Sequence, residues 1–340
     1  MIRLTRHLRG ITALTGAGAL ALSLTSCAGG SDDSSADNGG IRIVASTSTW
    51  GDLAQQVVDD AEEESGTDLD ITVDTILSGT DDDPHAYEAT ARDIATIRDA
   101  DVVVGNGAGY DNWLTDNAGD DSEVITAAPL AEAHDHSHED GEDGEEGEEE
   151  AHDHAEDDAS DESDGHDHGD SLLAGEENPH VWLDMDVVTG FADSLAAHLN
   201  TLDESIPAEA TGVTEMAEGF TERIQALPHA HVILTESVAA KLLDGSEVHD
   251  VTPEGFARSV LNEGEPSVAD LSSTRDLVTG GEADALITNR QSESQSSERL
   301  SDAAEDADVP VVNVNETPDT DQDYEGYVDT LISDLEEALA

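Results

Sequence analysis

From Ile41 onward, short runs rich in β-branched residues alternate with amphipathic stretches of helical spacing. The run IRIVAST (41–47) is typical of a buried strand, and the stretch after it, TWGDLAQQVVDDA (49–61), is typical of a helix. Strands that alternate with helices at short intervals lie parallel in a sheet and are joined by crossovers that cover its faces. The sequence therefore predicts an α/β fold.

The alternation occurs twice, once in each half of the chain. The first half has further strands predicted at 69–77, 101–107 and 122–128, with helices predicted at 88–100 and, beginning near residue 182, along Trp182, Val187, Val188, Phe191, Leu195 and Leu199. The second half has strands predicted at 231–237, 283–289 and 309–315, with helices at 238–245, 252–264, 267–281, 296–307 and 324–340. We interpret the halves as two Rossmann-like lobes with parallel sheets around a cleft, residues 41–204 and 229–340, joined by a long linking helix over 205–228.

The N-terminus has the features of an export signal. Three arginines precede an apolar stretch, 10–26, that is too short to span a bilayer comfortably. The sequence LTSC that ends at Cys27 resembles the lipobox of bacterial lipoproteins, in which the cysteine is lipid-modified and becomes the new N-terminus. We expect a signal peptide over 1–26, a flexible tether over 27–40, and an extracytoplasmic protein anchored by lipid to the outer face of the membrane. The alternative is a soluble secreted protein with an incidental cysteine.

Charge and cysteine content exclude several classes of function. The formal net charge is −69, so phosphate would be repelled over the whole surface and nucleic acid is not an expected partner. Cys27 is the single cysteine of the chain, which excludes a disulfide framework and a cysteine-based metal site.

Residues 131–177 form a segment of histidine, acid and glycine that lacks the apolar residues needed for a core, and we expect a disordered insertion. Its imidazoles are candidates for weak metal collection. They belong to His134, His136, His138, His152, His154, His166 and His168. The alternative is a solvated, charge-repelling insert with no role in metal delivery.

Two Pro-His pairs lie on either side of this segment, His85 within DDDPHAYEAT and His180 within ENPHVWLDM. Proline fixes its own φ and favours an extended residue before it, so such a turn restricts the backbone and holds the histidine in a defined position. Metal ligands need that rigidity because coordination distances are narrowly fixed. One Pro-His pair alone is more typical of a surface histidine than of a metal ligand, but two pairs around a histidine-rich insert favour a metal site.

At these motifs the chain resembles the zinc/manganese substrate-binding lipoproteins of ABC importers. The resemblance rests on DPHAYEAT, DADVVVGNGAGYDNWL (99–114), the acidic histidine-rich loop and NPHVWLD, and it extends over nearly all of the mature chain. It implies two α/β lobes bridged by a long helix, a metal ion held in the cleft, and delivery of that ion to a membrane permease. His85 and His180 match the two first-lobe ligands of the family.

The resemblance also implies two ligands from the second lobe. Glu236 stands where the zinc pattern has histidine and the manganese-associated branch has glutamate, and Glu316 stands near the final aspartate of the family, with Asp319 and Asn315 as alternatives. The physical rule for open α/β sheets agrees, since Glu236 and Glu316 follow predicted strands and ligands bind outside the carboxyl ends of strands. The remaining histidines of the ordered lobes are expected on the surface, away from metal: His198, His229, His231 and His249.

Two imidazoles and two carboxylates suit Zn²⁺ and also accommodate Mn²⁺, and the histidine-rich segment favours zinc. Four protein ligands leave no coordination position open for water, which favours transport of the metal ion over hydrolysis of a substrate. We therefore expect a monomeric, non-enzymatic binding protein that hands Zn²⁺ to an ABC permease. The alternatives are a Mn²⁺ carrier of the same family and a surface adhesin or extracellular metal buffer. A metallohydrolase is disfavoured because the chain has no HExxH or GxSxG motif.

Overall fold

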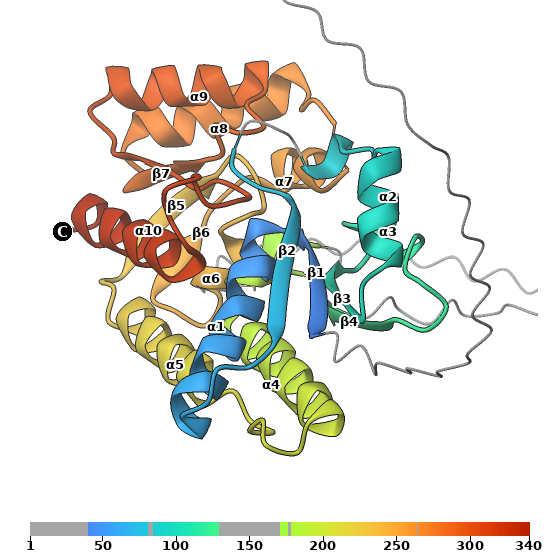
Figure 1. Cartoon of the computed structure of the whole chain (residues 1–340). Helices are drawn as coiled ribbons and strands as arrows, with labels where there is room; N and C mark the ends of the chain where they lie inside the picture. The colour runs from blue at the N-terminus through green and yellow to red at the C-terminus, as the bar shows by residue number, and fades with distance from the viewer. Residues whose placement is uncertain (1–39, 81–83, 129–170, 176–177, 263) are drawn as a thin grey trace, which may run out of the picture. The chain divides into compact units, whose positions relative to one another are not determined.

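The computed structural model describes residues 40–80, 84–128, 171–175, 178–262 and 264–340. The described residues form one compact unit built on two four-stranded parallel sheets (Figure 1). The predicted signal peptide, Cys27, and the seven histidines of the 131–177 segment lie outside the described residues. None of the helices in the described ranges is long and apolar enough to cross a membrane.

The first sheet has the strand order β2-β1-β3-β4. Its strands are β1 (Ile41–Thr47), β2 (Ile71–Leu77), β3 (Val102–Gly107) and β4 (Glu123–Ala128). The helices of this half are α1 (Ser48–Ser65), α2 (Ala91–Arg98), α3 (Asn112–Thr115) and α4 (Met185–Leu202), with short 3₁₀ helices η1 (Pro84–Ala86), η2 (Leu172–Ala174) and η3 (Val181–Leu183). β3 is buried along its whole length, which explains the three consecutive valines with which it begins.

The second sheet repeats the same order, β6-β5-β7-β8. Its strands are β5 (Ala230–Leu234), β6 (Val248–Asp250), β7 (Ala285–Thr288) and β8 (Val311–Asn313). The helices that accompany it are α6 (Ala240–Leu243), α7 (Glu254–Leu261), α8 (Val268–Gly280), α9 (Gln295–Asp306) and α10 (Tyr324–Ala338). The repeated parallel order confirms the predicted α/β fold class. In each sheet the second and third strands in sequence lie on opposite sides of the first, and ligands of such sheets bind beyond the carboxyl ends of the strands.

Helix α5 (Thr211–Gln225) follows the first half and leads to β5. It packs against α1, α4 and α10 (Figure 1). It begins six residues later than the predicted linking helix of 205–228. Pro207 lies in the irregular segment before it and disfavours helical geometry in the preceding residue. The division into lobes at 41–204 and 229–340 remains our proposal.

The apolar core is continuous between the sheets. One cluster of buried side chains contains Val104 of β3 and Leu234 of β5, together with Leu195 of α4 and Leu331 of α10. Burial of apolar area on this scale is the main favourable term for folding. The two sheets are therefore joined by one packed core.

Two further local features differ from the prediction. The helix predicted from residue 182 begins at Met185, because the Asp184 side chain accepts a hydrogen bond from the Val187 backbone N–H and caps the helix there. Trp182 instead lies in η3. Strand β6, which has only three residues, was not predicted at all.

Candidate metal centre

A cavity of about 310 Å³ lies beyond the carboxyl ends of β5 and β8, against the loop that carries η3. Three of the four predicted ligands line it: His180, Glu236 and Glu316. Glu236 comes two residues after the end of β5, and Glu316 comes three residues after the end of β8. The structure thus brings side chains from both halves of the chain to one cavity.

Hydrogen bonds to Asn178 fix the orientation of the His180 ring. The His180 backbone N–H donates to Asn178 Oδ1 at 2.9 Å, and His180 Nδ1 lies 2.8 Å from that oxygen and 3.0 Å from Ser237 Oγ. The Asn178 Nδ2 group donates to the carbonyls of Leu173 and Ser237 at 2.8 and 2.9 Å, which fixes Oδ1 as the oxygen. Nδ1 therefore carries the proton, and Nε2 is the nitrogen with the lone pair that a metal ion requires.

Glu316 is the most deeply buried carboxylate at the cavity, with a relative exposure of 2%. Its Oε2 accepts a 2.8 Å hydrogen bond from the Tyr110 hydroxyl, and its Oε1 accepts one of 3.1 Å from Asn289 Nδ2. Glu316 Oε2 lies 4.0 Å from His180 Nε2. Because Zn–N and Zn–O bonds are each about 2.0–2.2 Å, both atoms are within reach of a single ion.

The loop after β3 positions Tyr110. The Asp111 carboxylate accepts hydrogen bonds from the backbone N–H groups of Asn106 and Gly107 at 2.6 and 2.9 Å, and burial raises its pKa. Asn106 Nδ2 also donates to the Pro179 carbonyl at 2.8 Å, directly beside His180. The GNGAGYD sequence (105–111) therefore contains the end of β3 and the turn after it, and Asn106 connects it to the NPH motif.

Further hydrogen bonds join the end of β2 to the segment after Glu316. The Thr317 hydroxyl donates to the Gly79 carbonyl at 2.8 Å, and the Thr80 hydroxyl donates to Asp319 Oδ1 at 3.2 Å. These residues lead from β2 towards η1, in which His85 lies. The position of the His85 side chain is outside what the structure describes, so its role as a ligand remains a prediction.

The alternatives to Glu316 have other contacts. Asp319 is exposed and accepts the Thr80 hydrogen bond, while Asn315 Oδ1 accepts a 2.8 Å hydrogen bond from Asn313 Nδ2. Neither of them is among the described residues that line the cavity. The geometry therefore favours Glu316 over both.

Sequence reasoning missed the residues that hold the ligands, namely Tyr110, Asn178, Ser237, Asn289 and Gln291. Gln291 Oε1 accepts a 3.0 Å hydrogen bond from the Glu316 backbone N–H. Asn178 and Asn289 could have been identified from the sequence, because Asn178 is the first residue of the NPH motif and Asn289 directly follows a buried strand. The Trp182 ring packs against His180, with 5.1 Å between the ring centroids.

The remaining described histidines stand elsewhere. His229 is exposed, and His198, His231 and His249 are half-buried. None of these four is among the described residues that line this cavity.

Comparison with known proteins agrees with this architecture. The chain matches the family model described as zinc-uptake complex component A, periplasmic (ZnuA), over residues 43–338. A manganese-binding lipoprotein, MntA, of Halalkalibacterium halodurans is 30% identical over 127 residues, which is 36% of this chain and 39% of that relative's length.

Solved structures share the fold at lower identity. The laminin-binding adhesin Lmb of Streptococcus agalactiae, in a mutant form, has a TM-score of 0.58 and 18% identity, with 88% of this chain and 100% of that chain covered. FpvC of Pseudomonas aeruginosa in complex with Mn²⁺ has a TM-score of 0.57 and 20% identity, with 88% and 98% covered. A ZnuA crystal structure has a TM-score of 0.57 and 16% identity, with 88% and 97% covered. The chain belongs to the ZnuA family of periplasmic, metal-binding solute-binding proteins of ABC uptake systems, which are transport proteins and not enzymes.

Proposed function

We propose that this chain captures one Zn²⁺ ion with His85, His180, Glu236 and Glu316 and delivers it to an ABC permease. In this proposal the protein works as a monomer outside the cytoplasm, held to the outer face of the cell membrane by lipid on Cys27. Family membership supports the transport role. The lipobox-like LTSC sequence supports the anchor.

The observation that carries the proposal is the buried pair of His180 and Glu316, whose Nε2 and Oε2 atoms are 4.0 Å apart. Taking a carboxylate out of water is unfavourable unless hydrogen bonds or a cation compensate it. Tyr110 and Asn289 supply two neutral donors. A divalent ion between the imidazole and the carboxylate would supply the positive charge that this arrangement favours.

Zinc is favoured because imidazole nitrogen is a preferred zinc ligand and the 131–177 segment adds seven further imidazoles to the chain. Manganese is the second candidate. Carboxylates supply half of the proposed ligands, and oxygen donors suit Mn²⁺. The MntA relative, described as manganese-binding, supports the same alternative.

Competition titration of the metal-free protein with Zn²⁺ and Mn²⁺ tests both parts of the proposal. We expect one tight site that prefers zinc, and we expect His180→Ala and Glu316→Gln each to weaken it by about a hundredfold or more, since loss of a supporting group alone costs 10–100-fold. Glu265→Gln is the matched control, because Glu265 lines the same cavity but is bonded to Ser296 and is not a proposed ligand. Equal loss in the control and in Glu316→Gln would contradict the assignment.

Deletion within the histidine-rich segment separates weak binding from tight binding. The deletion should span 131–170, because Leu173 is fully buried and its carbonyl accepts a hydrogen bond from Asn178. We expect the shortened protein to keep the tight ion and lose only weakly bound ones. Delivery is tested by zinc uptake in cells that depend on this protein, where Cys27→Ser is expected to release it from the membrane and reduce uptake.

A further inference from the structure

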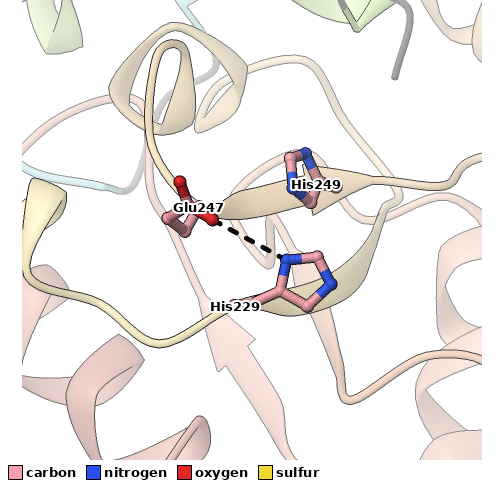
Figure 2. Close-up of side chains that lie close together, drawn as sticks. All are labelled: His229, Glu247 and His249. Carbon is pink, nitrogen blue, oxygen red and sulfur yellow. Dashed lines mark ion pairs between the residues drawn. The ribbon is translucent and has the colours of Figure 1, made fainter. Parts of the chain in front are cut away.

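A second group of metal-ligating side chains lies on the second sheet, and we call it the edge cluster: His229, Glu247 and His249. Each offers one ligand atom, and these atoms all lie within 4.8 Å of one another. Figure 2 shows His249 on β6, with Glu247 directly before that strand and His229 directly before the neighbouring β5, and the Glu247 carboxylate faces the His229 ring. The distance from His229 Nδ1 to Glu247 Oε2 is 3.9 Å.

The parallel register of β5 and β6 brings these residues together. His231 is the registered partner of His249, and the Ala230 backbone N–H donates to the Glu247 carbonyl at 3.2 Å. Side chains alternate between the faces of a strand, and neighbouring strands lie about 4.8 Å apart. His229 and Glu247 each stand two residues before a registered histidine, so all of these side chains share one face of the sheet.

The edge cluster is separate from the candidate metal centre. Glu236 follows the carboxyl end of β5, whereas His229 precedes its amino end. Seven residues at about 3.3 Å each place these two positions roughly 20 Å apart along the strand. One ion therefore cannot bridge the two groups, and the edge cluster is a site beyond the proposed function.

The surroundings of the edge cluster attract cations. His231 and His249 line a cavity of about 610 Å³ together with the carboxylates of Asp244, Glu282 and Asp284. Carboxylates gathered along one cavity raise the local concentration of cations. His229 and Glu247 have side-chain exposures of 56% and 72%, so their rotamers are free to close around an ion at little cost.

The geometry points to a second divalent-metal site of zinc type, with His229, Glu247 and His249 as its protein ligands and water in the remaining position. Two imidazoles and one carboxylate are a common ligand set for Zn²⁺, with bonds of about 2.0–2.2 Å. One ligand atom of each residue already lies within 4.8 Å of the other two, so the three side chains are gathered around one position. The neighbouring His231 ring, whose centroid is 5.3 Å from that of His229, packs against the site.

The test measures zinc stoichiometry by equilibrium dialysis on the full chain, with the seven histidines of the 131–177 segment replaced by asparagine to remove weak binding there. We expect His229→Ala/His249→Ala to lose one bound zinc per chain and Glu247→Gln to weaken the same ion by about tenfold or more. His198→Ala, which removes a histidine from α4, is the matched control and is expected to keep every ion.

Glu247→Gln keeps the shape of the side chain, so a folding defect in the double variant leaves the test intact. His180→Ala is expected to lose the other zinc and keep this one, which separates the edge cluster from the candidate metal centre. If the double variant binds as many zinc ions as its parent, with equal affinities, the edge cluster is not a metal site.

Discussion

The Tyr110 hydroxyl donates a 2.8 Å hydrogen bond to Glu316 Oε2. A residue that follows β3 of the first sheet therefore orients a carboxylate that follows β8 of the second sheet. The Tyr110 ring also packs against His180 and Trp182, with centroid distances of 5.9 and 5.3 Å. One side chain therefore contacts proposed ligands from both halves of the chain. Residues that orient ligands in this way tune metal affinity without binding the ion themselves.

Tyr110→Phe removes this hydrogen bond and keeps the ring. We expect zinc affinity to fall by about 10–100-fold, because the Glu316 carboxylate loses a donor that fixes its orientation. Isothermal titration of the metal-free variant checks this. Affinity equal to that of the unmodified protein would show that the Tyr110 hydroxyl does not act on the site.

Asn178→Ala tests the control of the His180 tautomer. The change removes the oxygen that receives the Nδ1 proton and leaves the carbonyls of Leu173 and Ser237 without their donor. We expect about 1–3 kcal/mol of destabilisation and at least a tenfold loss of zinc affinity. Ser237→Ala is the matched comparison and is expected to have the smaller effect, because Asn178 remains as the acceptor. A larger effect of Ser237→Ala would show that Ser237, and not Asn178, fixes the tautomer of His180.

Gly79→Ala tests the junction between β2 and the segment after Glu316. Gly79 has φ +79°, and a Cβ there would lie 2.6 Å from the Thr320 side chain. We expect a loss of about 2 kcal/mol in unfolding free energy, from the left-handed backbone and the contact together. Gly66→Ala has a similar φ of +65° and open space around it, so about 1 kcal/mol is expected there. Chemical denaturation of both variants measures the difference, and equal losses would show that the Thr320 contact is relieved without cost.

Asp52→Asn tests a pH-dependent contribution to stability. Burial and the nearby Asp323 carboxylate raise the pKa of Asp52 from 3.8 to about 6. The folded state therefore binds more protons than the unfolded state between about pH 4 and 6, so this residue lowers stability as pH rises through that window. Allowing for partial exposure, we expect Asp52→Asn to add about 1 kcal/mol at pH 7 and nothing at pH 4.

Denaturation of Asp52→Asn and of the unmodified protein at the two pH values measures this difference. Asp59→Asn alters an exposed carboxylate of the same helix and serves as the control. A gain at pH 4 as large as that at pH 7 would contradict a titration of Asp52 in this window.

The strand and helix pattern was predictable where elements are long and buried. β1 has the predicted bounds of 41–47, and the predicted runs at 101–107 and 122–128 contain β3 and β4. β6 was missed because its three residues, VHD, have neither length nor alternation to mark them. That omission also hid the edge cluster, since His249 can be placed beside His231 only when the register of β5 and β6 is known.

The candidate site was predictable only in part. Motifs and strand ends indicated His180, Glu236 and Glu316, and all three line one cavity. The residues that hold them come from distant parts of the chain, as Tyr110 and Asn289 do at Glu316. A hydrogen bond across 206 residues leaves no mark in local sequence pattern, so such partners require coordinates.

Anomalous diffraction at the zinc edge from crystals of the zinc-loaded protein locates the tightly bound ion. We expect one strong peak in the cavity beyond β5 and β8, about 2.0–2.2 Å from His180 Nε2 and from a Glu316 oxygen, with His85 and Glu236 completing the coordination. An ion bound there without Glu316, or a cavity that stays empty while zinc binds tightly elsewhere, would contradict this expectation.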